Sequence, residues 1–187
     1  MTLPKLITSD HKDLPSIIKN ILETRIPKFI RDEPPAYRHA GVLIPLLEED
    51  GIYKVIFTKR TDTVEHHKGQ ISFPGGSVDE EDVSVEQTAL REAREEIGLE
   101  TEDVEMLGRI DDALTLASKF IVHPFVGLIP YPYDFSVSPS EVETLIMVPL
   151  DVFRLESAET KRDYVEFENV TYRSPVYAYN DNLIWGA

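Results

Sequence analysis

Cysteine is absent from this chain of 187 residues. Its absence excludes disulfide bonds, a catalytic thiolate and cysteine-ligated zinc. Long hydrophobic runs are also missing, because the longest apolar stretches, such as Val42 to Leu47, have the length of a strand, whereas a membrane-spanning helix needs roughly 20 residues. Residues Met1 to Leu6 lack a basic segment followed by an apolar one. We therefore expect no secretory signal and, by default, a cytoplasmic location.

Positive charge is scarce. Nineteen basic side chains stand against 34 acidic ones, which gives a formal net charge of −15. A surface of this sign argues against general binding to nucleic acid or to anionic membranes, so we expect neither partner. Most of the acidic residues serve solubility. If the protein acts on a phosphorylated small molecule, however, local neutralisation is required, and bound divalent cations would provide it.

The chain begins with a predicted helix. Asp13 can cap it, Pro15 suits its first turn, and the apolar residues that follow form one stripe at helical spacing. Pro27, Pro34 and Pro35 then interrupt the chain. The sequence therefore predicts a helical extension over residues 1–35 and a main domain over residues 36–187.

The main domain alternates apolar stretches with turns. Predicted strands are Ala40 to Leu47, Tyr53 to Thr58, Ile71 to Phe73, Glu105 to Ile110, Ile121 to Ile129, Val165 to Tyr172 and Val176 to Tyr179. Pro149 to Phe153 has the pattern of a short helical turn. Strands interrupted by one central helix predict an α/β domain with a mixed sheet.

The central helix is bounded by clear signals. Ser84 and Gln87 have the spacing of a capping box, and Gly98 is a suitable stop. Within it, Glu92, Glu95 and Glu96 fall within an arc of about 100° around the helix axis.

This acidic arrangement has two interpretations. Like charges at such spacing repel each other unless a positive charge lies among them. Three carboxylates suit Mg²⁺ or Mn²⁺ better than zinc or copper, and Arg91, four residues before Glu95, could hold one of them in place. The alternative is a solvated acidic face that forms a few ion pairs with Arg91 and Arg94.

The setting of this helix favours the metal site. Gly76 is followed, after 14 residues, by Arg91-Glu92-Ala93-Arg94-Glu95-Glu96-Ile97-Gly98-Leu99, which resembles the box of the Nudix hydrolase family. The nine-residue section matches the family pattern completely. The loop before it departs from the pattern in two ways. Asp82 stands where the family has glutamate, and eight residues rather than seven separate it from Arg91.

The resemblance implies a Nudix fold, which is an α/β/α sandwich around a mixed sheet, and hydrolysis of a nucleoside diphosphate linked to another group. It also implies that Glu92, Glu95 and Glu96 coordinate Mg²⁺ or Mn²⁺, with the carbonyl of Gly76 as a further ligand. The cations would bridge the diphosphate oxygens and lower the pKa of an attacking water.

The segment before the box resembles the signature of the coenzyme A pyrophosphatase branch of this family. The matching residues are Thr58, Arg60, His67, Gly69, Phe73, Pro74, Gly75 and Gly76. Glu65 departs from the signature, which has arginine there. The implied substrate is coenzyme A or a derivative, cleaved to 3′,5′-ADP and 4′-phosphopantetheine. Expected substrate-binding residues are Lys59, Arg60, His67, Lys68, Gly69 and Phe73. The basic residues among them belong to the main cationic stretch of the chain, which suits a phosphorylated substrate, and Gly69 and Phe73 belong to the signature.

The resemblance continues to the end of the chain. Glu141, in a loop after Pro139-Ser140, is a candidate general base or ligand, and an exposed surface acid is the alternative reading. The family usually continues into a helix after Trp185-Gly186-Ala187. Without that helix, apolar surface would be exposed, and we expect a homodimer to cover it.

Two other functions remain open. One is a different Nudix substrate, such as ADP-ribose, a dinucleotide or a damaged nucleotide. The other is a non-catalytic module that keeps the fold for binding. The complete set of helix glutamates favours an enzyme over the second alternative.

Overall fold

The computed structural model describes residues 13–32, 35–61, 70–115, 118–154, 161–167 and 170–185, with backbone alone for residues 161–174. In this part of the chain, eight strands form one mixed sheet. Its main path runs β3 (Ile71–Ser72), β2 (Ile52–Arg60), β1 (Arg38–Glu49), β7 (Phe120–Leu128) and β5 (Glu105–Arg109). Three strands pair off this path: β4 (Gly75–Ser77) with β1, β6 (Ala113–Thr115) with β7, and β8 (Val142–Pro149) with β2.

Strand β1 is the centre of the sheet. One of its edges pairs in parallel with β7 along nearly its whole length. The other edge changes partner, from β4 at residues 40–42 to β2 at residues 46–49. The strands β4 and β2 therefore pair with different stretches of β1.

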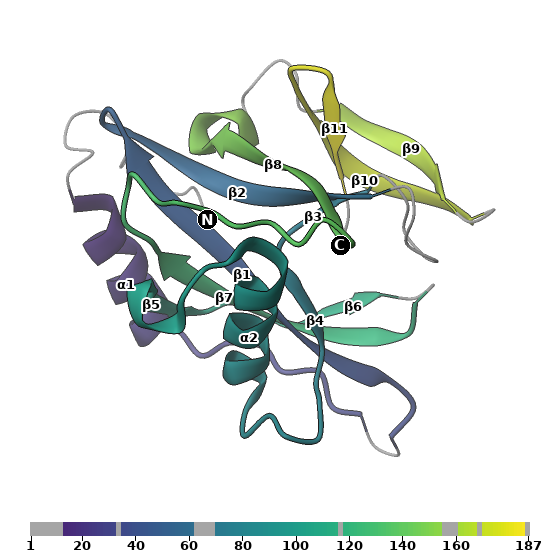
Figure 1. The fold of residues 1–187 in the computed structure, drawn as a ribbon. Coiled ribbons are helices and arrows are strands. Elements are labelled where there is room, and N and C mark those ends of the chain that lie inside the picture. The colour runs from purple at the N-terminus through teal and green to yellow at the C-terminus, as the bar shows by residue number, and fades with distance from the viewer. Residues whose placement is uncertain are drawn as a thin grey trace.

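Each face of the sheet has its own core, because successive residues of a strand point to opposite faces. Helix α2 (Val85–Ile97) covers one face, where Ala89, Ala93 and Ile97 pack on Leu43 and neighbouring residues. The opposite face is covered by helix α1 (Leu14–Thr24) and by a small sheet of β9 (Lys161–Phe167), β10 (Val170–Tyr179) and β11 (Asn182–Ile184). Figure 1 shows α2 across the sheet, with α1 and the small sheet at opposite sides of the view. The mixed sheet with a helix on each face confirms the predicted α/β fold class.

Both predicted helices are present. Ser84 caps α2 by accepting a hydrogen bond from the backbone N–H of Gln87 at 3.1 Å. The side chain of Gln87 accepts from the N–H of Val83 rather than that of Ser84. Gly98 ends the helix in the left-handed conformation with φ 68°. In α1, Asp13 occupies the predicted N-cap position, but its side chain makes no capping hydrogen bond.

Helix α1 and the residues after it pack and hydrogen-bond at the edge of the sheet formed by β5. Ile18 and Leu22 join the core of the face opposite α2. The backbone N–H of Ile30 donates to Asp112 at 2.9 Å, and the N–H of Lys28 donates to Asp111 at 2.9 Å. Residues 14–30 therefore form one packed unit with the sheet. No helix in the described part of the chain has the length and apolar character needed to cross a membrane.

Several strand predictions need correction. Strands β4, β6 and β8 and the terminal strand β11 were not expected. The 3₁₀ turn Leu150–Phe153 confirms the predicted short helical turn. The predicted strand from Val165 to Tyr172 is wrong, because β9 ends at Phe167 and β10 starts at Val170, opposite it. The apolar pattern continues from β9 into β10, so the pattern alone does not show where one strand ends and the next begins.

Candidate functional site

The three helix glutamates differ in exposure although they share one side of α2. The side chain of Glu95 is 52% exposed, that of Glu92 is 17% exposed, and that of Glu96 is 4% exposed. Glu96 thus lies beneath the surface, facing β4, whereas Glu95 reaches into solvent. The helix presents a graded row of carboxylates from inside to outside.

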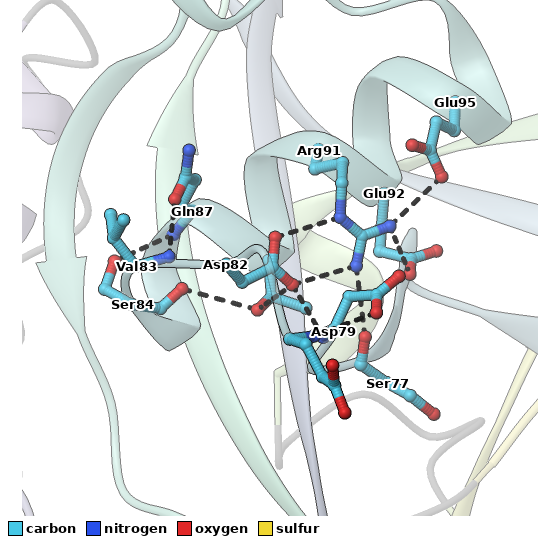
Figure 2. Close-up of polar contacts among 11 residues, drawn as sticks. Ser77, Asp79, Asp82, Val83, Ser84, Gln87, Arg91, Glu92 and Glu95 are labelled. Carbon is cyan, nitrogen blue, oxygen red and sulfur yellow. Dashed lines mark hydrogen bonds and ion pairs between the residues drawn. The ribbon is translucent and has the colours of Figure 1, made fainter.

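Arg91 holds two of these carboxylates. One terminal nitrogen, Nη1, donates to Glu92 Oε1 at 2.9 Å and to Glu95 Oε2 at 3.1 Å. The other, Nη2, donates to the carbonyl of Ser77 at 3.1 Å, at the end of β4. Figure 2 shows the guanidinium at the centre of these contacts. The predicted positioning role of Arg91 has a direct geometric basis.

Asp82 completes the contacts of Arg91. Its carboxylate accepts from Arg91 Nε and Nη2, both at 3.0 Å, and from the hydroxyl of Thr88 at 2.8 Å (Figure 2). The two hydrogen bonds from Arg91 hold the pKa of Asp82 well below its usual range, and the reciprocal contact raises the pKa of Arg91. Although its spacing from Arg91 differs from the family pattern, Asp82 therefore lies against the Arg91 guanidinium.

Gly76 lies directly against Glu92. A Cβ atom at this position would stand 2.4 Å from the Glu92 carboxyl group, so any side chain there would displace that carboxylate. Burial raises the pKa of Glu92, although the contact with Arg91 opposes the shift. The backbone of β4 and the carboxylate of Glu92 are therefore brought together, as the predicted ligand pair requires.

Glu96 has two partners from the strands. Its Oε2 accepts from the backbone N–H of Gly75 at 3.2 Å, and its Oε1 lies 3.7 Å from Nη1 of Arg60 at the end of β2. Burial nevertheless raises the pKa of Glu96 to about 7, and the nearby negative charges of Glu92 and Glu141 contribute. These two partners therefore do not offset the free-energy cost of burying a charged Glu96.

Glu141 belongs to the same cluster. The loop before β8 runs along the C-terminal end of α2, where the N–H of Ser138 donates to the Glu96 carbonyl at 2.9 Å. The Glu141 carbonyl accepts from the N–H of Thr61 at 3.0 Å, next to Arg60. Its carboxylate is close enough to raise the pKa values of Glu92 and Glu96. The fold thus brings the predicted loop acid to the helix glutamates.

The other predicted substrate residues lie elsewhere or outside the described residues. Lys59 points to the opposite side of β2 from Arg60 and pairs with Glu143 at 2.9 Å. Phe73 stacks on Phe57 with a centroid separation of 4.5 Å and packs against the core. His67, Lys68 and Gly69, like the departing Glu65, fall in the segment 62–69, outside the described residues.

The donor chemistry of this cluster fits a hard divalent cation, because it combines buried and exposed carboxylate oxygens with the backbone of Gly76. The raised pKa values of Glu92 and Glu96 show that additional positive charge would stabilise their ionised forms. Among the described residues, however, no three acidic or histidine side chains converge as a ready-made metal site. The glutamates contact Arg91 and Arg60 instead.

Two features of this region were not predicted from the sequence. The contact of Gly75 N–H with Glu96 depends on β4, which was not expected as a strand. A second network joins His39, His123, Asp112 and Arg109. His39 Nδ1 lies 2.8 Å from His123 Nε2, and His123 Nδ1 lies 2.9 Å from Asp112. Its residues lie in separate segments of the chain, so no local spacing could have indicated it.

Known proteins resemble this chain in sequence and in fold. The NUDIX domain model matches residues 37–167. A protein of Photorhabdus laumondii described as "Uncharacterized Nudix hydrolase NudL" is 36% identical over 149 residues, covering 80% of this chain and 78% of the relative. A protein of Pectobacterium atrosepticum with the same description is 35% identical over 170 residues, covering 86% and 85%.

Solved structures agree on the fold. The NUDIX domain of Shewanella oneidensis NrtR, complexed with ADP ribose, has a TM-score of 0.51 and 21% identity, covering 71% of this chain and 82% of that one. A binary complex of the C. elegans Ap4A hydrolase has a TM-score of 0.52 and 17% identity, covering 61% and 81%. At such identities the likeness concerns the fold alone. With the family model over most of the chain and relatives above 30% identity, this chain belongs to the Nudix family, as a Nudix hydrolase.

Proposed function

We propose that this Nudix hydrolase cleaves the diphosphate linkage of coenzyme A or of its acyl derivatives. The reaction would use Mg²⁺ or Mn²⁺ and would release 3′,5′-ADP and 4′-phosphopantetheine or its acyl form. More broadly, the substrate is a nucleoside diphosphate derivative, as expected of the family.

One observation carries the choice of coenzyme A. The segment that resembles the coenzyme A branch begins at Thr58 and ends at Gly76, and both its ends meet at one carboxylate. Arg60, near the start, lies 3.7 Å from Glu96, and the N–H of Gly75, near the end, donates to the same side chain at 3.2 Å. The two ends of the segment therefore meet at the acidic cluster. We propose that His67, Lys68 and Gly69, which lie between these ends in the sequence, contact the substrate, and that the two basic residues meet its additional 3′-phosphate.

The roles of the residues follow from their positions. Glu92, Glu95, Glu96 and the carbonyl of Gly76 would hold the cations, which when bound neutralise charge on the diphosphate and lower the pKa of water. Arg91 orients Glu92 and Glu95 through the hydrogen bonds described above. Glu141 would accept a proton from the attacking water at a carboxylate oxygen. A new oxygen–phosphorus bond forms, the bridging oxygen–phosphorus bond breaks, and the bridging oxygen leaves with the other phosphate.

A substrate panel tests the proposal. The full chain is assayed with Mg²⁺ or Mn²⁺ on coenzyme A, acetyl-coenzyme A, ADP-ribose, a dinucleoside polyphosphate and 8-oxo-dGTP, and the products are weighed by mass spectrometry. Release of 3′,5′-ADP from coenzyme A, at a higher kcat/KM than for the other compounds, is the expected result. Turnover of another compound but not of coenzyme A would contradict the proposal. Ligand binding with no turnover of any compound would favour the non-catalytic alternative.

A further inference from the structure

Arg60 makes a contact that a role in substrate binding alone does not explain. Its guanidinium faces inward to Glu96, at 3.7 Å, and the Glu96 side chain is only 4% exposed. Its Nε is buried and, among the described residues, has no hydrogen-bond partner. Arg60 thus forms a long ion pair with the buried Glu96, and its Nε–H is left without an acceptor among the described residues.

The strand directs Arg60 to this position. On β2, Ile56 belongs to the core under α2 and Phe57 to the opposite core, so residues 56, 58 and 60 face α2. The β2–β8 ladder shifts register between Lys59 and Arg60, next to Glu143. Such irregularities commonly redirect side chains at the end of a strand. Lys59 therefore pairs with Glu143 on the outside, while Arg60 is directed to the acidic cluster.

The surroundings of Glu96 show what this positive charge does. The groups that influence its pKa, apart from burial, are the Arg60 guanidinium, the N–H of Gly75, and the carboxylates of Glu92 and Glu141. Arg91 is occupied by Asp82, Glu92 and Glu95. Arg60 is therefore the cationic side chain that the described structure places against Glu96.

We propose that Arg60 is an exchangeable counter-ion: it neutralises Glu96 when no cation is bound, and moves to a phosphate oxygen of the substrate when a cation replaces it. The unused Nε favours this exchange, because a guanidinium can bind a phosphate with two parallel N–H groups. This inference rests on the proposed function, since it assigns a second position of Arg60 to the diphosphate.

The exchange has two consequences for binding. Without substrate, Arg60 competes with the cation for Glu96, so its removal should tighten cation binding. With a diphosphate present, Arg60 has an alternative partner, so the diphosphate and the cation should strengthen each other's binding. Such coupling is reciprocal by thermodynamic necessity. A purely structural Arg60 would produce neither effect.

The test measures Mn²⁺ affinity by electron paramagnetic resonance, with and without ADP as a non-reacting diphosphate probe. In Arg60→Gln, Mn²⁺ should bind about tenfold more tightly than in the wild type when ADP is absent, since a positive charge a few ångströms from the site is removed. The increase in Mn²⁺ affinity caused by ADP should be smaller by about the same factor. The KM for coenzyme A should rise more than kcat falls.

Matched controls separate this effect from general changes in charge. Lys54→Gln removes one positive charge from the same strand, where Lys54 pairs with Glu49, and should change Mn²⁺ affinity by less than about twofold. Arg60→Lys keeps the charge and should bind Mn²⁺ as weakly as the wild type. Because it lacks the planar fork, it should lose part of the coupling to ADP. Melting curves of the cation-free variants establish that each is folded.

The outcomes are distinct. Mn²⁺ affinity that is unchanged or weaker in Arg60→Gln, or undetectable in the wild type, would overturn the exchange. Tighter Mn²⁺ binding together with undiminished coupling to ADP would overturn the second half of the proposal. If the wild type binds Mn²⁺ but does not hydrolyse coenzyme A, the proposed function fails, while the Mn²⁺ measurements still decide for or against the exchange.

Discussion

Glu96 is the residue at which burial and charge oppose each other most strongly. Its carboxylate lies below the surface between Gly75 and Arg60, and burial raises its pKa to about 7. An unfolded chain loses this proton near 4.5, whereas the cation-free folded protein keeps it until about pH 7. The stability of the cation-free protein is therefore reduced as the pH rises through this interval.

Replacing Glu96 by Gln should remove this cost. With a chelator present at pH 8, Glu96→Gln should have a higher free energy of unfolding than the wild type, by about 1 to 3 kcal/mol. The difference should nearly vanish below pH 4.5, and urea unfolding monitored by fluorescence measures it. Glu95→Gln, whose side chain is 52% exposed, serves as the control and should change stability by less than about 0.5 kcal/mol. A less stable Glu96→Gln at pH 8 would contradict the account of Glu96.

Asp82 shows the opposite balance, because hydrogen bonds from Arg91 stabilise its charge. Asp82→Ala leaves Arg91 and Thr88 without this acceptor, so we expect the free energy of unfolding to fall by about 2 kcal/mol. Arg91 would also hold Glu92 and Glu95 less firmly, so Mn²⁺ affinity should fall several-fold. Glu80→Ala, an exposed position in the same loop, should do neither. Wild-type Mn²⁺ affinity in Asp82→Ala would show that Arg91 needs no such support.

At the scale of elements, the buried network beside β7 connects the N-terminal segment to the sheet. Burial raises the pKa of Asp112, but hydrogen bonds from Ile30 N–H, His123 and Arg109 outweigh it and hold the pKa below its usual value. Burial also lowers the pKa of His123, which accordingly stays neutral more readily in the folded protein. Asp112 thus joins the chain after α1 to His123 through hydrogen bonds.

The lowered pKa of His123 predicts a pH dependence. The unfolded chain binds a proton at His123 near pH 6.5 and the folded protein resists it, so this contribution to stability is present above pH 6.5 and is lost below it. Between pH 7.5 and 5.5, His123→Gln should therefore lose less unfolding free energy than the wild type, by about 1 kcal/mol. The opposing contribution of Glu96 is common to both proteins and cancels. Equal losses measured in urea would rule out a titrating role for His123.

The elements differ in how well the sequence predicts them. Helix α2 follows from Ser84, Gly98 and a regular apolar stripe, all of which are local signals. Strand β4 consists largely of glycine, and its identity depends on pairing with residues 40–42 of β1, which lie more than thirty positions earlier in the chain. In β8, the exposed Glu143 and Thr144 break the alternating pattern next to a register shift. Elements that depend on distant partners are therefore the ones that local patterns miss.

The same distinction holds for the candidate site. Glu92, Glu95 and Glu96 could be grouped from the sequence because helical spacing alone puts them on one side of α2. Their partners could not be assigned in this way. Arg60 reaches Glu96 only because α2 packs on the sheet to which β2 belongs, and the sequence alone could not show that Lys59 faces away from Glu96.

At the scale of the whole molecule, the net charge of −15 opposes the approach of an anionic substrate. With Mg²⁺ kept saturating, salt should screen this repulsion, so kcat/KM for coenzyme A should rise about twofold or more between 20 and 150 mM KCl. Steady-state kinetics at a series of salt concentrations measures the effect. A steep fall over this range would instead indicate that local basic residues dominate the encounter.

The central claim is that the α2 carboxylates support metal-dependent hydrolysis of a diphosphate. The most direct measurement compares Mg²⁺-dependent release of 3′,5′-ADP from coenzyme A by the wild type, Glu95→Gln and Glu96→Gln. Both substitutions keep the size of the side chain and remove its charge. Turnover by the wild type should stop when Mg²⁺ is chelated, and kcat should fall at least about a hundredfold in each variant. Wild-type turnover in both variants would contradict a role of these carboxylates in metal-dependent hydrolysis.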